Sequence, residues 1–149
     1  MLEGKRIAID VGTKRIGVAT TDSANILCSP LATVSDVSEV LTHLDESVCL
    51  IYVGLPLNLK GEFTPSTRMA LDFAKQLGNT TTIPVRLIDE RLTTNLAQGN
   101  LREAGKAAKS SKGIIDQASA VVILEEALRI EKITGTPAGK SLEEVQDES

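Results

Sequence analysis

Aromatic side chains are scarce in this sequence: tryptophan is absent, and one tyrosine and two phenylalanines make up 2% of its 149 residues. Stacking of bases on aromatic rings can therefore contribute little to any binding of nucleic acid. Cys28 and Cys49 are the only cysteines, and they lack the CxxC spacing of a metal site, so we expect two buried free thiols. His43 is the only histidine and has no nucleophile or metal ligand at a suitable spacing. Ser-His-Asp and Cys-His mechanisms are therefore disfavoured.

Long hydrophobic runs are also missing. The longest apolar stretches, such as residues 118–124, fall far short of the ~20 residues that span a bilayer. Residues 1–6 lack the charged start, the apolar stretch and the cleavage site of a signal peptide. We therefore expect a cytoplasmic protein without a membrane partner.

The sequence has no general excess of positive charge. Its net charge is -4, and residues 125–149 account for all of it, with seven acids against three bases. Residues 1–124 are balanced, so local basic patches can still bind phosphate backbones.

The first third of the chain predicts strands followed by a helix. Three segments are rich in β-branched residues and are separated by short polar turns, at residues 6–11, 16–21 and 26–34. Such segments are typical of an antiparallel meander. A helix beginning at Ser35 or Asp36 follows, because its apolar residues repeat at i, i+3, i+4 and i+7.

Strands and helices alternate in the rest of the chain. The nearly continuous apolar run 48–53 predicts a central parallel strand. Thr64 and Pro65 then begin a helix that ends at Gly78. The remaining segments predict a second parallel strand, a helix, a polar basic linker and a long helix, at residues 85–89, 94–104, 106–112 and 113–133.

This order of elements predicts an α/β fold. Three antiparallel strands and then two parallel ones form a mixed five-stranded sheet flanked by helices. The arrangement matches the ribonuclease H-like architecture. We expect one domain over residues 1–134 and a flexible acidic tail over residues 135–149, which lack a sustained apolar pattern.

Three acids stand where an open α/β sheet concentrates function. Asp10 interrupts an apolar strand, where a carboxylate is unfavourable unless it is paired, hydrogen-bonded or metal-bound. Glu90 follows the last parallel strand, at the end where ligands bind, and Asp116 opens the long final helix. Converging carboxylates need a cation between them, and such a site selects Mg²⁺ or Mn²⁺. Two such ions ~3.5–4 Å apart can activate a water and stabilise the leaving oxygen of a phosphodiester, so the site predicts hydrolysis of a nucleic-acid backbone.

Each of these acids also has a purely structural interpretation. Asp10 could satisfy turn amides near Gly12, and Glu90 could pair with Arg91. Asp116 could be a favourable charge in the first turn of a helix. The spacing of the residues leaves both interpretations open.

Four segments closely resemble the YqgF/RuvX family in order and spacing, across roughly residues 5–130. They are IDVGTKRIGVA at 9–19, VGLPLN at 53–58, DERLTT at 89–94 and IDQASA at 115–120. The resemblance implies a relative of the RuvC Holliday-junction resolvases, a nuclease that processes the 5′ end of pre-16S ribosomal RNA. It also implies ribosomal particles as binding partners.

The resemblance also implies that Asp10, Glu90 and Asp116 are the catalytic metal ligands, with Mg²⁺ or Mn²⁺ as the cofactor. Strand alternation allows only one of Asp89 and Glu90 to point into the site, and we predict Glu90. The stretch before Asp116 is less basic than the family pattern, and Ser119 replaces an alanine.

Five basic residues are candidates for contacts with the phosphates of nucleic acid, because Lys and Arg position a backbone without reading its sequence. Each could equally be a solvated surface charge. The candidates are Lys14, Arg15, Arg91, Lys109 and Lys112.

Three other functions compete with an RNA nuclease. The family resemblance leaves open a resolvase acting on branched DNA, and the same fold could serve as a non-catalytic module that binds RNA or ribosomes. Residues 10–13 also resemble the first phosphate loop of the actin and sugar-kinase superfamily, but those proteins need two lobes. Residues 99–107 depart from a P-loop in both spacing and final residue. No apolar stripe identifies an interface, so a monomer and a homodimer both remain open.

Overall fold

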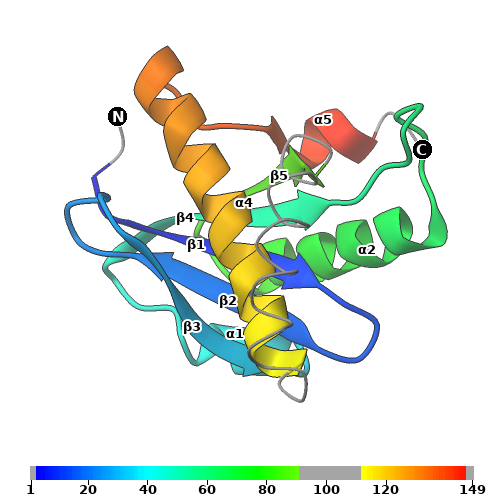
Figure 1. Ribbon diagram of the computed structural model, residues 1–149, viewed down its shortest axis with the longest axis horizontal. Helices are drawn as coiled ribbons and strands as arrows, with labels where there is room; N and C mark the ends of the chain where they lie inside the picture. Colours follow the sequence, from blue (N-terminus) through cyan, green and yellow to red (C-terminus); the bar gives the residue numbers. More distant parts are fainter. Residues whose placement is uncertain (1–2, 91–111, 147–149) are drawn as a thin grey trace.

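The computed structural model describes residues 3–90 and 112–146, in which one twisted sheet lies between helices (Figure 1). Within these residues six strands form the sheet, in the order β3-β2-β1-β4-β5-β6. The strands are β1 (Lys5–Val11), β2 (Ile16–Thr21), β3 (Cys28–Val34), β4 (Val48–Leu55), β5 (Val85–Asp89) and β6 (Lys140–Ser141). The helices are α1 (Val37–Leu41), α2 (Pro65–Thr80), α4 (Lys112–Thr134) and α5 (Leu142–Gln146).

The predicted α/β fold with a mixed sheet flanked by helices is confirmed. Strands β1, β2 and β3 pair antiparallel, whereas β4 pairs parallel with both β1 and β5. The predicted number of five strands is wrong, because β6 pairs antiparallel with β5. A strand of two residues carries no alternating pattern, so the sequence gives no periodic signal for it.

Local sequence explains where the main elements lie. Strand β4 is almost wholly buried along its length, as its continuous apolar run predicts. Helix α2 begins at a capping box, in which the Thr64 hydroxyl accepts from the backbone N–H of Thr67 and the Thr67 hydroxyl accepts from that of Thr64. Pro65 occupies the first turn, where the missing N–H costs nothing.

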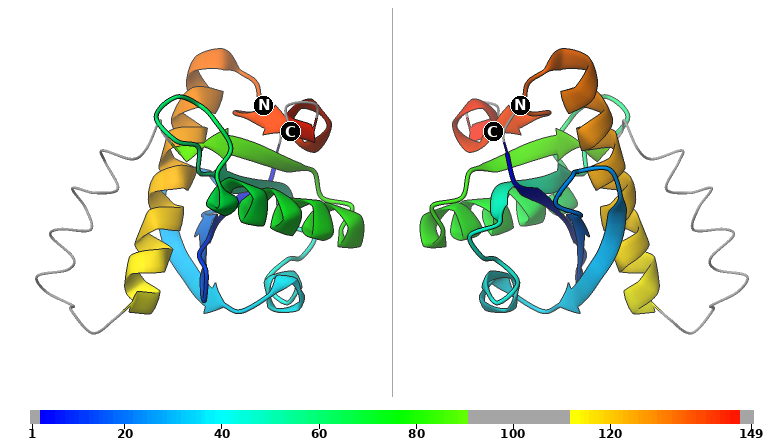
Figure 2. Two further views of the ribbon diagram at one scale, coloured as in Figure 1. Left: turned by 90° about the vertical axis from the view of Figure 1, so that its right-hand side faces the viewer. Right: turned by 90° about the vertical axis from the view of Figure 1, so that its left-hand side faces the viewer.

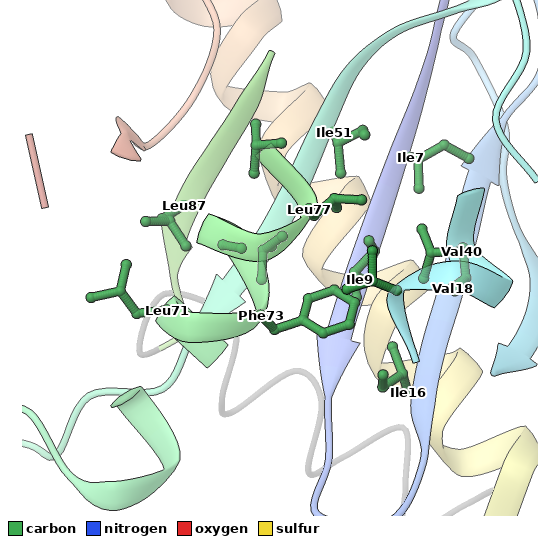
Figure 3. Close-up of a cluster of buried hydrophobic side chains, with 14 of the residues drawn as sticks. Ile7, Ile9, Ile16, Val18, Val40, Ile51, Leu71, Phe73, Leu77 and Leu87 are labelled. Carbon is green, nitrogen blue, oxygen red and sulfur yellow. The ribbon is translucent and has the colours of Figure 1, made fainter. Parts of the chain in front are cut away.

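The sheet has a hydrophobic core on each face. Helices α1, α2 and α5 cover one face, and α4 crosses the other, as the views in Figure 2 show. On the α2 face, buried side chains from alternate strand positions meet Val40, Phe73 and Leu77 (Figure 3). On the α4 face, Ala120, Ile123, Leu124 and Ala127 pack on the other set of strand residues. The two alternating sets decide which side chains can meet α4.

The C-terminal segment differs from the flexible tail expected over residues 135–149. Residues 140–146 form β6 and α5, and Ala138 and Val145 are each 1% exposed. The Arg86 side chain donates to the carbonyl oxygens of Ala138 and Gly139, both at 2.7 Å, and so holds this segment against β5. These contacts join residues more than fifty positions apart, which explains why local composition indicated a tail.

Two predicted elements lie outside the described residues: the helix at 94–104 and the basic linker that ends at Lys112. Helix α4 begins at Lys112 and corresponds to the long helix predicted over 113–133. No helix in the described parts is long and apolar enough to cross a membrane.

Candidate active site

Asp10 lies on the α4 face of the sheet, near the carboxyl end of β1. Ile7 and Ile9 belong to the core under α2, while Ala8 belongs to the core under α4. Because strand residues alternate between faces, Asp10 follows Ala8 onto the α4 side. Its neighbour across the antiparallel ladder is Gly17 of β2.

Glu90 directly follows β5, the strand on the far side of β4 from β1, and its side chain lies on the same face as Asp10. Ile88 packs under α4, and Glu90 follows it two residues later. Asp89 instead follows Leu87, which belongs to the α2 face. The alternation that the sequence predicted therefore places Glu90, rather than Asp89, on the side of Asp10.

The carboxyl groups of Glu90 and Asp10 meet above β4. The Glu90 carboxyl lies so close over Gly54 that a Cβ atom added there would be 2.5 Å from Glu90 Oε1. The Glu90 and Asp10 side chains share a hydrogen bond. Two carboxyl groups can share a bond in this way only if a proton lies between them.

Burial, the negative charge of Asp10, the hydrogen bond to Asp10 and the charge of Asp89, in that order of size, together raise the pKa of Glu90 to about 8. At neutral pH and without a cation, Glu90 therefore tends to hold its proton. A divalent cation between the two groups would favour the ionised form instead.

Asp116 belongs to the first turns of α4, and its side chain lies outside the described part of the structure. The next residue, Gln117, donates to the hydroxyl of Thr33 at 2.8 Å. Thr33 pairs with Gly17, and Gly17 pairs with Asp10, so the three residues form one row across the sheet. The start of α4 therefore crosses the sheet at the level of Asp10.

The structure brings two of the three predicted acids together, while the role of all three as metal ligands stays a prediction. Among the described side chains, no three His, Cys, Asp or Glu residues form a group that could hold a metal. The side chain of Asp116 lies outside these described residues.

The basic candidates are placed in part. Lys14 is exposed and Arg15 is half-buried in the turn between β1 and β2, which the backbone N–H of Gly12 closes by donating to the carbonyl of Arg15 at 2.9 Å. This turn leaves β1 just after Asp10. Arg91 and Lys109 lie outside the described residues, as does the side chain of Lys112.

Sequence reasoning missed a buried polar network at the other end of α4. The guanidinium of Arg6 pairs with Glu131 at 2.7 Å, and both side chains are almost fully buried. The hydroxyl of Tyr52 donates to Glu131 at 2.6 Å and accepts from the N–H of Ala138 at 3.0 Å. A charged Arg6 inside an apolar strand was the available signal for a buried partner.

Residues 4–130 of the sequence match the model of the RuvX family, described as Holliday junction resolvase. The chain belongs to this family. Among its relatives, proteins of Clavibacter michiganensis subsp. michiganensis and Streptomyces coelicolor (strain A3(2)) are 44% and 40% identical to it. The alignments cover 91% and 97% of this chain and 89% and 92% of those proteins, and both are named as pre-16S rRNA nucleases.

The fold also matches a solved structure, that of T. thermophilus RuvC in complex with a Holliday junction substrate. The match has a TM-score of 0.54 at 14% identity and covers 90% of this chain and 98% of that one. At this identity it shows the fold, which is the ribonuclease H-like arrangement predicted from the order of the strands.

Proposed function

We propose that this RuvX family member is a metal-dependent nuclease that hydrolyses phosphodiester bonds of pre-16S ribosomal RNA. The single observation that carries the proposal is the pair of carboxyl groups of Asp10 and Glu90, joined by a hydrogen bond at the carboxyl end of the sheet. A half-buried pair of acids in contact is unfavourable without a function for it. The names of the relatives support RNA as the substrate.

The donor set fits Mg²⁺ or Mn²⁺. Carboxylate oxygens are the ligands that these ions prefer, and the raised pKa of Glu90 reflects negative charge that a cation would balance. When bound, such ions polarise a phosphoryl oxygen and lower the pKa of a bound water. We propose Asp10, Glu90 and Asp116 as the ligands, with enough negative charge together for two ions.

We propose Asp116 as the third ligand because of its place on α4. Ala120, Ile123 and Ala127 are buried against the sheet. Position 116 precedes Ala120 by four residues and therefore continues the same stripe of the helix. The next residue, Gln117, bonds to the row that contains Asp10, and this contact supports Asp116 as the third ligand.

The chain's basic residues would hold the RNA backbone. Lys14 and Arg15 stand in the turn that follows Asp10, so a phosphate bound there would approach the acids from the end of β1. We propose Arg91, Lys109 and Lys112 as further phosphate contacts. Contacts of this kind position the backbone, and the acids then act on it.

Cleavage of an end-labelled pre-16S ribosomal RNA fragment tests this function. We expect cleavage with Mg²⁺ or Mn²⁺ and none after chelation. Asp10→Asn and Asp116→Asn should each lower the rate at least about 100-fold, because each removes a charge from the metal site. Asp72→Asn, an exposed acid on α2, is the matched control and should cleave normally. Cleavage by both site variants at the normal rate would refute the assignment.

A four-way DNA junction belongs in the same assay, since the family description names a Holliday junction resolvase. Cleavage of the junction in preference to the RNA would favour the resolvase function. Metal-independent binding of RNA without cleavage would instead favour a non-catalytic RNA-binding module.

A further inference from the structure

We propose that Gly54 is a positioning residue of the candidate site, because the absence of a side chain there leaves the space through which Glu90 reaches Asp10. The inference rests on the proposed function only in treating Glu90 as a metal ligand.

Gly54 stands between the two strands that carry the acids. In β4, alternate residues Leu50 and Tyr52 are fully buried under α4, and Gly54 is the next position on that face. Val53 pairs with Ile9 of β1, and Gly54 pairs with Ile88 of β5. Gly54 therefore lies between two strands. On one side is Ile88 of β5, two residues before Glu90, and on the other side is β1, the strand that carries Asp10.

The geometry of the sheet requires the Glu90 side chain to cross β4 at this position. Neighbouring strands lie ~4.8 Å apart, so β5 and β1 are separated by roughly 10 Å across β4. A glutamate on β5 can meet an aspartate on β1 only if its side chain crosses the backbone of β4. Any side chain at Gly54 would occupy that crossing.

The available space supports this directly. A Cβ at position 54 would lie 2.5 Å from Glu90 Oε1, 3.0 Å from Glu90 Cδ and 2.8 Å from Ile123 Cδ1. Both neighbours are ends of flexible side chains, so an added methyl group would displace the carboxyl group and the isoleucine methyl rather than the backbone. Gly54 also has no positive φ, so its conformation does not itself require glycine. The space above it does.

Isothermal titration calorimetry of Mn²⁺ binding to the full chain tests the proposal. We expect Gly54→Ala to weaken binding about 10- to 100-fold, the range seen when residues that orient metal ligands are changed. Gly78→Ala is the matched control: its added Cβ would meet only Leu142 Cδ1, at 2.8 Å, on the α2 side of the molecule. Binding by Gly54→Ala at the wild-type affinity would overturn the proposal.

A second substitution separates positioning from packing. Ile123→Val removes the Cδ1 atom that the new methyl group would meet and so relieves the packing conflict in Gly54→Ala. If Gly54 positions Glu90, the double variant should recover thermal stability while Mn²⁺ binding stays weak. Recovery of Mn²⁺ affinity together with stability would show that Gly54 serves packing only.

A readout without metal keeps this proposal distinct from the proposed function. In metal-free Gly54→Ala, a crystal structure shows where the Glu90 carboxyl group lies, and we expect it to be displaced from Asp10 by the added Cβ. A Glu90 carboxyl group that stays over position 54 and beside Asp10 would overturn the proposal. Wild-type protein that binds no Mn²⁺ would refute the proposed function, and the metal-free structure would still decide the role of Gly54.

Discussion

Glu90 combines three features that rarely occur together in a surface acid: burial, a second carboxyl group as its hydrogen-bond partner and a third acid beside it. Together these features raise its pKa to about 8. In the unfolded chain the same residue titrates at about 4.3. Folding without a cation therefore takes up a proton over the range between these values, and this makes the stability of the protein depend on pH.

The sign of that dependence follows from the proton count. Between about pH 5 and pH 8 the folded protein holds a proton on Glu90 that the unfolded chain has lost. The free energy of unfolding of the metal-free protein should therefore fall as the pH rises through this range, by about 1.4 kcal/mol for each unit of raised pKa. Urea unfolding followed by circular dichroism at pH 5, 6, 7 and 8 measures the slope.

Glu90→Gln supplies the control for this prediction. Glutamine keeps the size of the side chain but cannot ionise, so the variant should lose the part of the slope that Glu90 causes and be more stable than wild type at pH 8. All other titratable groups are the same in the two proteins, so their contributions cancel in the comparison. Equal slopes in the two proteins would show that Glu90 is an ordinary acid. Mn²⁺ should stabilise wild type at pH 8 more than Glu90→Gln.

At the scale of an element, α4 is fixed to the sheet at two places. Gln117 bonds to Thr33 near its start, and Glu131 pairs with Arg6 and Tyr52 near its end. The two anchors are fourteen positions apart in the sequence, which is about 21 Å along the helix. Two anchors this far apart fix both the position and the direction of the helix, and so decide where position 116 lies relative to Asp10.

Removing only one partner of the Arg6–Glu131 pair should strongly destabilise the protein. Arg6→Met or Glu131→Leu leaves a buried charge without its partner, and each should lower the free energy of unfolding by about 3–5 kcal/mol. The double variant should lose less than the sum of the two, because no unpaired charge remains. Urea midpoints measure all three.

Arg129→Met serves as the comparison. Arg129 also pairs with a glutamate, Glu126, but its side chain is 59% exposed, so the change should cost no more than about 1 kcal/mol. Single variants at Arg6 and Glu131 that are as stable as Arg129→Met would show that the buried pair does not anchor α4.

Elements and site residues were predictable where their signals are local. β-Branched residues between short polar turns marked β1 and β2, a continuous apolar run marked β4, and Thr64 with Pro65 marked the start of α2. The topology then implied that Asp10 and Glu90 could meet across β4. The pair of Arg6 and Glu131 was not predictable, because the two residues are 125 positions apart and only the fold brings them together.

The role of Gly54 was hidden for a different reason. A glycine signals a turn or a positive φ in sequence analysis, whereas here it matters for the volume that it leaves empty. That volume is defined by Glu90 and Ile123, which come from two other elements. Only the assembled site shows why a larger residue would not fit.

At the scale of the whole molecule, the C-terminal segment completes both cores. Ala138 packs under α4, and Val145 joins the core under α2, although residues 135–149 were expected to form a flexible tail. Strand β6 also covers the outer edge of β5, which would otherwise present unpaired backbone groups to solvent. The sheet edge beside Glu90 thus depends on residues far from it in the sequence.

Removal of residues 135–149 should therefore destabilise the protein rather than leave it unchanged. Val145→Asn tests the same contact with a single substitution and should lower the free energy of unfolding by about 2–3 kcal/mol, the value of burying a valine. Glu143→Gln, an exposed change in the same helix, is the matched control and should have little effect. Truncated protein and Val145→Asn that both unfold at the wild-type urea concentration would restore the flexible tail. A loss of stability in both would make β6 and α5 part of the folded domain, and the domain boundary would then lie beyond Val145.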